Sequence, residues 1–173
     1  MIELRNRQYM TIIDCLAGED LEVGHVITLD YFLAADPIQL RALKATATGS
    51  VNAITGPLLA WWINDRSTAV AYTGGEDGIS SPTVLGSSDS DANHYIPSGS
   101  RMLAIGGRGV AEVRLFADSL DSEFATTMPD AGDTLDFSTD ESMLCSTGNG
   151  SAAGGTYAFV LENDGVSIAV LLG

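Results

Sequence analysis

The sequence has little positive charge and no long apolar run. Eight Lys and Arg residues stand against 23 Asp and Glu residues, which leaves a formal net charge of -15 over 173 residues. Binding to nucleic acid phosphates needs clustered basic side chains, so we expect no nucleic acid partner. The longest apolar stretches, residues 57–63 and 166–172, are far shorter than the roughly 20 residues of a membrane-spanning helix. We therefore expect no membrane span.

Cysteine is equally scarce. Cys15 and Cys145 are the two cysteines, and neither belongs to a Cys-x-x-Cys or Cys/His ligand pattern. The sequence therefore predicts neither a zinc site nor a disulfide framework, but two reduced, buried thiols. Residues 1–14 contain charged side chains and no uninterrupted apolar stretch, so they do not resemble a secretory signal. We expect assembly in a reducing cytoplasm.

Histidine is also scarce, which limits acid–base chemistry. His25 and His94 are the ordinary bases near neutral pH, and neither belongs to a recognisable catalytic set. His25 follows a glycine in an expected strand and is interpreted as a packed or surface imidazole. His94 ends a polar loop and is interpreted as a contact residue. We predict that the protein is not an enzyme and has no cofactor.

One polar loop matches part of a calcium-binding pattern. Asp89, Asp91 and Asn93 occupy the first ligand positions of an EF-hand loop. The second half does not follow, because His94 stands where the turn needs glycine and Ser100 stands where the metal needs glutamate. We therefore expect no metal site.

Carboxylates are concentrated in residues 118–141. A glycosidase could use two of them, but nothing in their spacing marks an acid pair. We expect an acidic face that is either solvated or complementary to a basic partner. Its members are Asp118, Asp121, Glu123, Asp130, Asp133, Asp136, Asp140 and Glu141.

Glycine, in contrast, is abundant, with 19 residues spread along the chain. Together with many Ser, Thr and Asp residues, the glycines leave few windows long enough for a helix. The short apolar or alternating runs between them predict an all-β fold, a compact β-barrel or β-sandwich of short strands with Gly-rich turns. The expected strands are residues 21–23, 26–29, 58–63, 68–72, 102–105, 109–116, 135–137, 156–161 and 167–172.

Three further segments are expected to connect or interrupt these strands. Residues 162–165 end in Asp-Gly, the strongest hairpin signal in the chain. Residues 37–47 predict the one short helix, with Pro37 at its first turn and apolar residues on one side. Residues 74–93 have the composition of a protruding loop.

A short phrase occurs twice. The Ala-Gly-acid-x-Leu sequence at residues 17–21 returns at residues 131–135, and each copy is expected to lead a turn into a strand. Two explanations stay open. Turn chemistry recurs in any Gly-rich β protein, or a strand-turn unit is duplicated over residues 17–64 and 131–172.

Two segments carry candidate contact residues. Trp61 and Trp62 are adjacent on an expected strand and point to opposite faces, so we expect one in the core and the other at an interface. Residues 1–14 are expected to form an N-terminal arm outside a single β domain of residues 15–173. The apolar and basic side chains of the arm suited to a partner or another copy are Ile2, Leu4, Arg5, Arg7, Tyr9 and Met10.

The phrases AGEDLEVGHVITL, LKATATGSVNAITGPLLAWW and YIPSGSRMLAIGG together resemble the head decoration, or cement, proteins of tailed bacteriophages. The likeness covers much of the chain. It consists of a polar N-terminal arm, an A-G-x-x-L-x-x-G-x-V-I-x-L opening strand, short strands rich in Gly, Ala and Thr, and a proline-glycine turn at residues 97–99.

This resemblance implies a non-enzymatic all-β virion protein, usually a homotrimer, on the outer capsid surface. Such a protein clamps neighbouring major capsid proteins of the expanded capsid, so its partners are the major capsid protein and itself. Residues 1–14 would then add a strand to a neighbour. The alternative is a tail or fibre module that binds host carbohydrate through Trp61 or Trp62, with the acidic segment coordinating a cation.

Overall fold

The computed structural model describes residues 2–4, 10–32, 39–46, 57–61, 95–107, 111–149 and 156–173. Strands dominate these residues and confirm the predicted all-β class. The helical elements among them are two short 3-10 helices, η3 (Ala117–Ser119) and η4 (Ser122–Ala125). No helix in the described part of the chain is long and apolar enough to cross a membrane.

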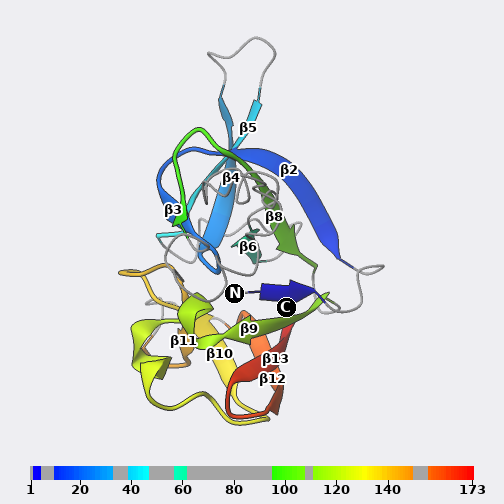
Figure 1. Ribbon diagram of the computed structural model, residues 1–173, viewed down its shortest axis with the longest axis vertical. Helices are drawn as coiled ribbons and strands as arrows, with labels where there is room; N and C mark the ends of the chain where they lie inside the picture. The colour runs from blue at the N-terminus through cyan, green and yellow to red at the C-terminus, as the bar shows by residue number, and fades with distance from the viewer. Residues whose placement is uncertain are drawn as a thin grey trace, which may run out of the picture.

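Five strands form a closed barrel in the order β2-β5-β4-β6-β8, in the upper part of Figure 1. All adjacent pairs are antiparallel except β2 and β5, which run parallel. Beside the barrel, β3 and β7 form a two-stranded ribbon. These strands are β2 (Thr11–Ala17), β3 (Leu21–Glu22), β4 (Val26–Phe32), β5 (Gln39–Lys44), β6 (Leu58–Trp61), β7 (Tyr95–Ile96) and β8 (Arg101–Gly106).

The other described strands form a six-stranded antiparallel sheet in the order β1-β9-β13-β12-β10-β11. Five of these strands come from the C-terminal part of the chain, whereas β1 precedes the barrel in sequence. The strands are β1 (Ile2–Leu4), β9 (Ala111–Phe116), β10 (Thr134–Phe137), β11 (Leu144–Ser146), β12 (Ala158–Asn163) and β13 (Ser167–Leu172).

Barrel and sheet share one cluster of buried apolar side chains, which includes Ile27 from the barrel and Phe137 from the sheet. Backbone contacts also join them at Ser142, which belongs to the turn before β11. The amide of Val26 donates to the Ser142 carbonyl at 2.6 Å. The Ser142 hydroxyl donates to the Ala45 carbonyl at 3.0 Å. Residues far apart in sequence therefore meet at a single core.

Most of the expected strands are present, with ends that differ by a few residues. They correspond to β3, β4, β6, β8, β9, β10, β12 and β13. The Asp164-Gly165 turn connects β12 to β13 as predicted, with Gly165 in the left-handed region at a φ of 84°. The expected strand at 68–72 and the expected loop at 74–93 lie outside the described residues.

The helix predicted over residues 37–47 is wrong, because residues 39–44 form strand β5. Every residue of β5 pairs antiparallel with β4, from Phe32 opposite Gln39 to Ile27 opposite Lys44. Leu, Arg, Ala and Lys are good helix formers, but pairing with β4 on one side and β2 on the other overrides this local preference. Residues 33–38 and 47–50 lie outside the described part of the chain.

The repeated Ala-Gly-acid-x-Leu phrase precedes a strand in both places, but its glycines serve different purposes. Gly132 has a φ of 102° and open space around it. Gly18 lies outside the left-handed region, and a Cβ added to it would come within 2.5 Å of Arg41 Cγ. The first copy leads into β3 and the second into β10, which belong to different sheets.

Candidate interaction surfaces

The N-terminal segment, which we expected to be an arm outside the β domain that contacts a partner, pairs with strands of its own chain near both of its ends. Ile2 is 6% exposed and belongs to the core. Strand β1 pairs with β9, and its three residues lie opposite Leu115, Arg114 and Val113. Barrel strand β2 begins at Thr11, ahead of the boundary expected at residue 14.

The remaining candidate contacts of this segment are only partly described. Leu4 lies in β1, and Met10 is partly buried against the core. The predicted contacts Arg5, Arg7 and Tyr9 lie outside the described residues. Residues 2–4 therefore form the end strand in the order of the six-stranded sheet, and residues 11–14 belong to barrel strand β2.

The two edges of that sheet differ. At the β11 edge, the Leu144 carbonyl accepts from the Asp121 amide at 3.0 Å, and the Ser146 amide donates to Glu123 Oε1. The segment that carries η4 therefore covers this edge. At the other edge, no strand in the described part of the chain lies beyond β1. An uncovered edge strand presents backbone groups that can pair with another chain.

Trp61 is the tryptophan that packs inward. It is partly buried against the core and lies opposite Leu103 in the pairing of β6 with β8. Trp62 lies outside the described residues. Trp61 is thus not the fully exposed interface tryptophan that we expected from one member of the pair.

The structure also exposes apolar side chains that sequence reasoning did not select. On the β12–β13 hairpin, Phe159 and Leu161 are exposed by about two fifths and Val166 by 68%. The available signal was β12 itself, AFVLEN, in which both alternating sets of positions begin apolar. Outside this hairpin, the exposed large apolar residues in the described ranges are Ile12, Tyr31 and Tyr95.

Much of the acidic segment caps the chain's own backbone. Asp121 accepts from the Glu123 amide at 3.0 Å at the start of η4, and Glu141 accepts from the Ser122 amide at 2.9 Å. Asp133 accepts from the Asp130 amide at 2.9 Å. These carboxylates therefore stabilise turns, as Asp and Glu do where they meet exposed amides.

The pKa of Glu123 reflects its hydrogen bonds within the chain. Burial tends to raise the pKa of Glu123, but hydrogen bonds from Ser146 and Asn149 outweigh burial and hold this pKa below its usual range. The ionised carboxylate is thus the form that covers the β11 edge.

Each arginine in the described part of the chain pairs with a carboxylate of the same chain. Arg101 meets Asp14, and their hydrogen bond lowers the pKa of Asp14. Arg41 meets Asp30 at 3.0 Å. The largest cluster surrounds Arg114, which binds Asp164, the Glu162 carboxylate at 2.9 Å and the Ser167 hydroxyl at 2.6 Å.

The residues considered for catalysis have structural places. His25 is 4% exposed, and its Nδ1 accepts from the Glu22 amide at 2.7 Å, so it closes the turn between β3 and β4. His94 lies outside the described residues. Burial raises the pKa of Cys15 to about 11 and that of Cys145 to about 12, with nearby carboxylates adding to both.

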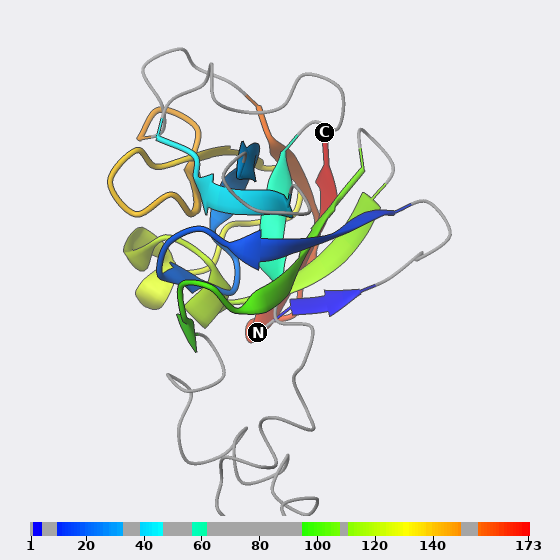
Figure 2. The same ribbon diagram turned by 90° about the horizontal axis from the view of Figure 1, so that it is seen from above.

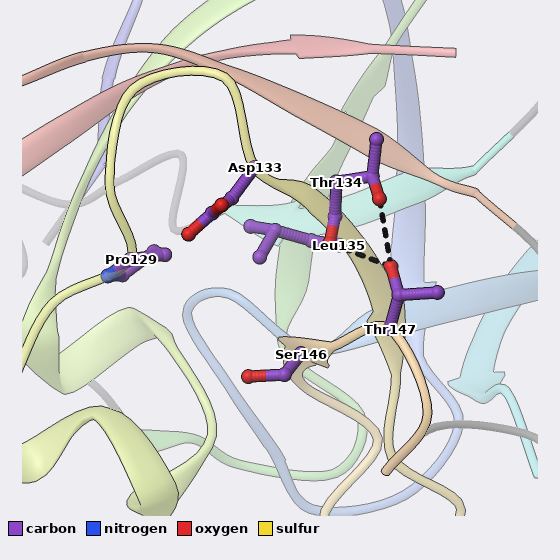
Figure 3. A pocket seen from close by; sticks show the side chains of 6 residues that line it. All are labelled: Pro129, Asp133, Thr134, Leu135, Ser146 and Thr147. Carbon is purple, nitrogen blue, oxygen red and sulfur yellow. Dashed lines mark hydrogen bonds between the residues drawn. The ribbon is translucent and has the colours of Figure 1, made fainter.

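A shallow pocket of about 270 Å³ lies beside the start of β10 (Figure 3). The hydroxyl groups of Thr134 and Thr147 bond within the fold, since they lie 2.9 Å apart and Thr147 Oγ1 also donates to the Thr134 carbonyl at 2.6 Å. Among the described residues, no three His, Cys, Asp or Glu side chains gather closely enough to hold a metal ion. The pocket is lined by Pro129, Asp133, Thr134, Leu135, Ser146 and Thr147.

Residues 2–4 at the open sheet edge thus form the strongest candidate contact surface. No protein-family model matches this chain, and no match is found among curated proteins or solved structures.

Proposed function

We propose that this protein is a non-enzymatic structural component of a phage virion. It binds the outer surface of the expanded capsid as a homo-oligomer, most simply a trimer, and clamps neighbouring major capsid proteins. The observation that carries this proposal is the contrast between the sheet edges, because the η4 segment covers β11 whereas no strand among the described residues lies beyond β1. The sequence resemblance to decoration proteins supports it.

The proposed mode of binding is strand addition. An extended segment of a capsid protein pairs with the free edge of β1, so backbone hydrogen bonds supply affinity. Arg5 and Arg7 follow β1 in the sequence and provide positive charge for acidic groups of the capsid. In this proposal the protein binds the expanded shell and not the unassembled capsid subunits. Its binding therefore stabilises the shell by mass action.

Trp61 bears on the alternative of a carbohydrate-binding tail or fibre module. A sugar platform needs an exposed aromatic face, whereas Trp61 packs against the core. This favours strand addition as the mode of contact.

Deletion of residues 1–9 tests the proposal. The deletion must stop there because Thr11–Asp14 belong to β2. The full-length protein should co-sediment with expanded capsids and raise their melting temperature, and the shortened protein should do neither. Circular dichroism verifies that its strands persist. The double variant Arg5→Glu, Arg7→Glu, which keeps β1, should also bind more weakly.

Val166→Ser provides the matched control, since Val166 is exposed on the hairpin turn and lies away from β1 in the sheet order. It should bind capsids as the full-length protein does. If the full-length protein ignores expanded capsids, or if the shortened protein binds them equally well, the proposed function is wrong.

A further inference from the structure

Strand β1 is out of sequence with the sheet that it completes. The other five strands of that sheet lie between residues 111 and 172, and the barrel strands lie between residues 11 and 106. Strand β1 precedes all of them, yet it pairs with β9 (Figure 2). The N-terminus thus donates one short strand to the C-terminal half of the fold.

The side of β9 that pairs with β1 offers both backbone pairing and a buried position for a side chain. Strand β13 pairs with β9 along six residues, and β1 pairs with the other side of β9 along three. Ile2 is 6% exposed and belongs to the shared core, next in the pairing to Leu115, which is fully buried. A strand that occupies this place buries an isoleucine and completes backbone pairing.

Five residues, 5–9, connect the end of β1 to Met10 ahead of β2. Fully extended, five residues span about 17 Å, so β1 of one copy can reach β9 of an adjacent copy. Strand β1 would make the same contacts with β9 of an adjacent copy as it makes with β9 of its own copy. We propose that β1 exchanges between copies of this protein, so that the β1 strand of one copy completes the sheet of the next.

Charge favours this partner. Residues 1–9 hold two arginines and one glutamate, whereas the whole chain carries a net charge of -15. A segment of opposite sign that reaches from one acidic copy to another reduces their mutual repulsion. Because the strand pairs in cis and in trans are equivalent, exchange is a low-cost route to an oligomer. This inference needs no capsid and stands apart from the proposed function.

A mixed-cysteine experiment tests the exchange. One copy carries Ile2→Cys and the other carries Leu115→Cys, positions that lie directly opposite in the β1–β9 pair and suit a disulfide. Co-expressed and oxidised, they should give a covalent dimer on a non-reducing gel. Cys15 and Cys145 are buried and should not react.

The matched control pairs Leu115→Cys with Val166→Cys, an exposed cysteine that is not a β1 residue. It should give no covalent dimer, because Leu115 is reached from β1 and not by random collision. A chain carrying Ile2→Cys and Leu115→Cys together reports the two modes directly. If it forms only the intramolecular disulfide, and the mixture gives no dimer, the proposal is overturned.

A second measurement leaves the core unchanged. Four Gly and Ser residues inserted between Arg7 and Gln8 let β1 return to its own β9 more easily, so the insertion should shift the protein toward monomer in sedimentation velocity. The unmodified protein should sediment as an oligomer. A monomer in both cases, or an oligomer that the insertion does not change, contradicts the exchange.

Discussion

The barrel and the six-stranded sheet differ in what happens to the backbone groups at their strand edges. Closure removes strand edges from the barrel, whereas the sheet keeps two edges, of which the η4 segment covers β11 and no described strand covers β1. The barrel pairs its charges at the surface, as Asp30 does with Arg41, whereas the sheet buries Arg114 in its ion cluster. Among the described residues, the edge that no strand covers therefore belongs to the sheet and not to the barrel.

The two halves are nevertheless held tightly against each other, and four predictions test how far they behave as one unit. One close contact between them is at Gly24, in the turn before β4. Its φ is 105°, and a Cβ added there would lie 2.6 Å from the carbonyl oxygen of Ser119 in η3. Neither the backbone conformation nor the space at this contact accepts a side chain.

Gly24→Ala should produce the largest effect, a loss of about 3 kcal/mol in the free energy of unfolding, because strain and overlap add. Urea denaturation measures it. Gly132→Ala is the control, with a φ of 102° but nothing within 4 Å, and should cost about 1 kcal/mol. Equal losses of unfolding free energy in the two variants would show that the backbone near Ser119 moves to accept the added methyl group without cost.

Ser142 should give the next largest effect. Ser142→Ala removes the hydrogen bond to the Ala45 carbonyl and should cost about 1 to 2 kcal/mol. Ser142→Gly loses the same bond but accepts the φ of 58° more readily, so it should be about 1 kcal/mol milder. Both are measured by urea denaturation. If glycine is the worse substitution, backbone strain at this position is unimportant.

The β12–β13 hairpin should lose stability as the pH falls from about 4 toward 2. Amides of Val166 and Ser167, followed by Arg114, lower the pKa of Asp164 from 3.8 to about 2. Because the folded-state pKa is the lower one, the stabilisation is complete above about pH 4 and is lost as the pH falls toward 2. Asp164→Asn should flatten the pH dependence of unfolding in this range.

Asp140→Asn is the control for that titration, because Asp140 is exposed in the turn between β10 and β11 and lies outside the β12–β13 hairpin. Unfolding in urea between pH 5 and pH 2 gives the slopes. The prediction fails if Asp164→Asn and the unmodified protein lose stability in parallel.

The last prediction compares the urea concentrations at which the barrel and the sheet unfold, and we expect no difference between them. Cys15 reports on the barrel and Cys145 on the sheet, and both are buried with raised pKa values. In the single-cysteine variants Cys145→Ala and Cys15→Ala, thiol labelling should begin at the same urea concentration, since one core joins both halves. Earlier labelling of one thiol would show that its half opens alone.

Local patterns were sufficient for strands whose burial can be read from neighbouring residues. The alternation and glycine boundaries around β8, β9 and β13 predicted those strands directly. Strand β5 was missed because QLRALK is locally compatible with a helix, and only its pairing with β4 and β2 makes it a strand.

The candidate site was harder to predict than the fold. The apolar side chains in residues 1–14 predicted contact with a partner or another copy, whereas Ile2 is buried in the core of its own chain opposite Leu115, far along the sequence. The cover of the β11 edge likewise depends on Glu123 meeting Ser146. Such contacts leave no periodic signal, since neither partner changes the residue pattern around it.

The position of β1 in the chain also sets a schedule for synthesis. Leu4 leaves the ribosome roughly 110 residues before Val113, with which it pairs, a delay of about 5 to 20 s at ordinary elongation rates. During that time the barrel strands can be completed while β1 has no β9 to join. A finished neighbour on the same polysome could offer β9 first, so the order of translation favours partners made side by side.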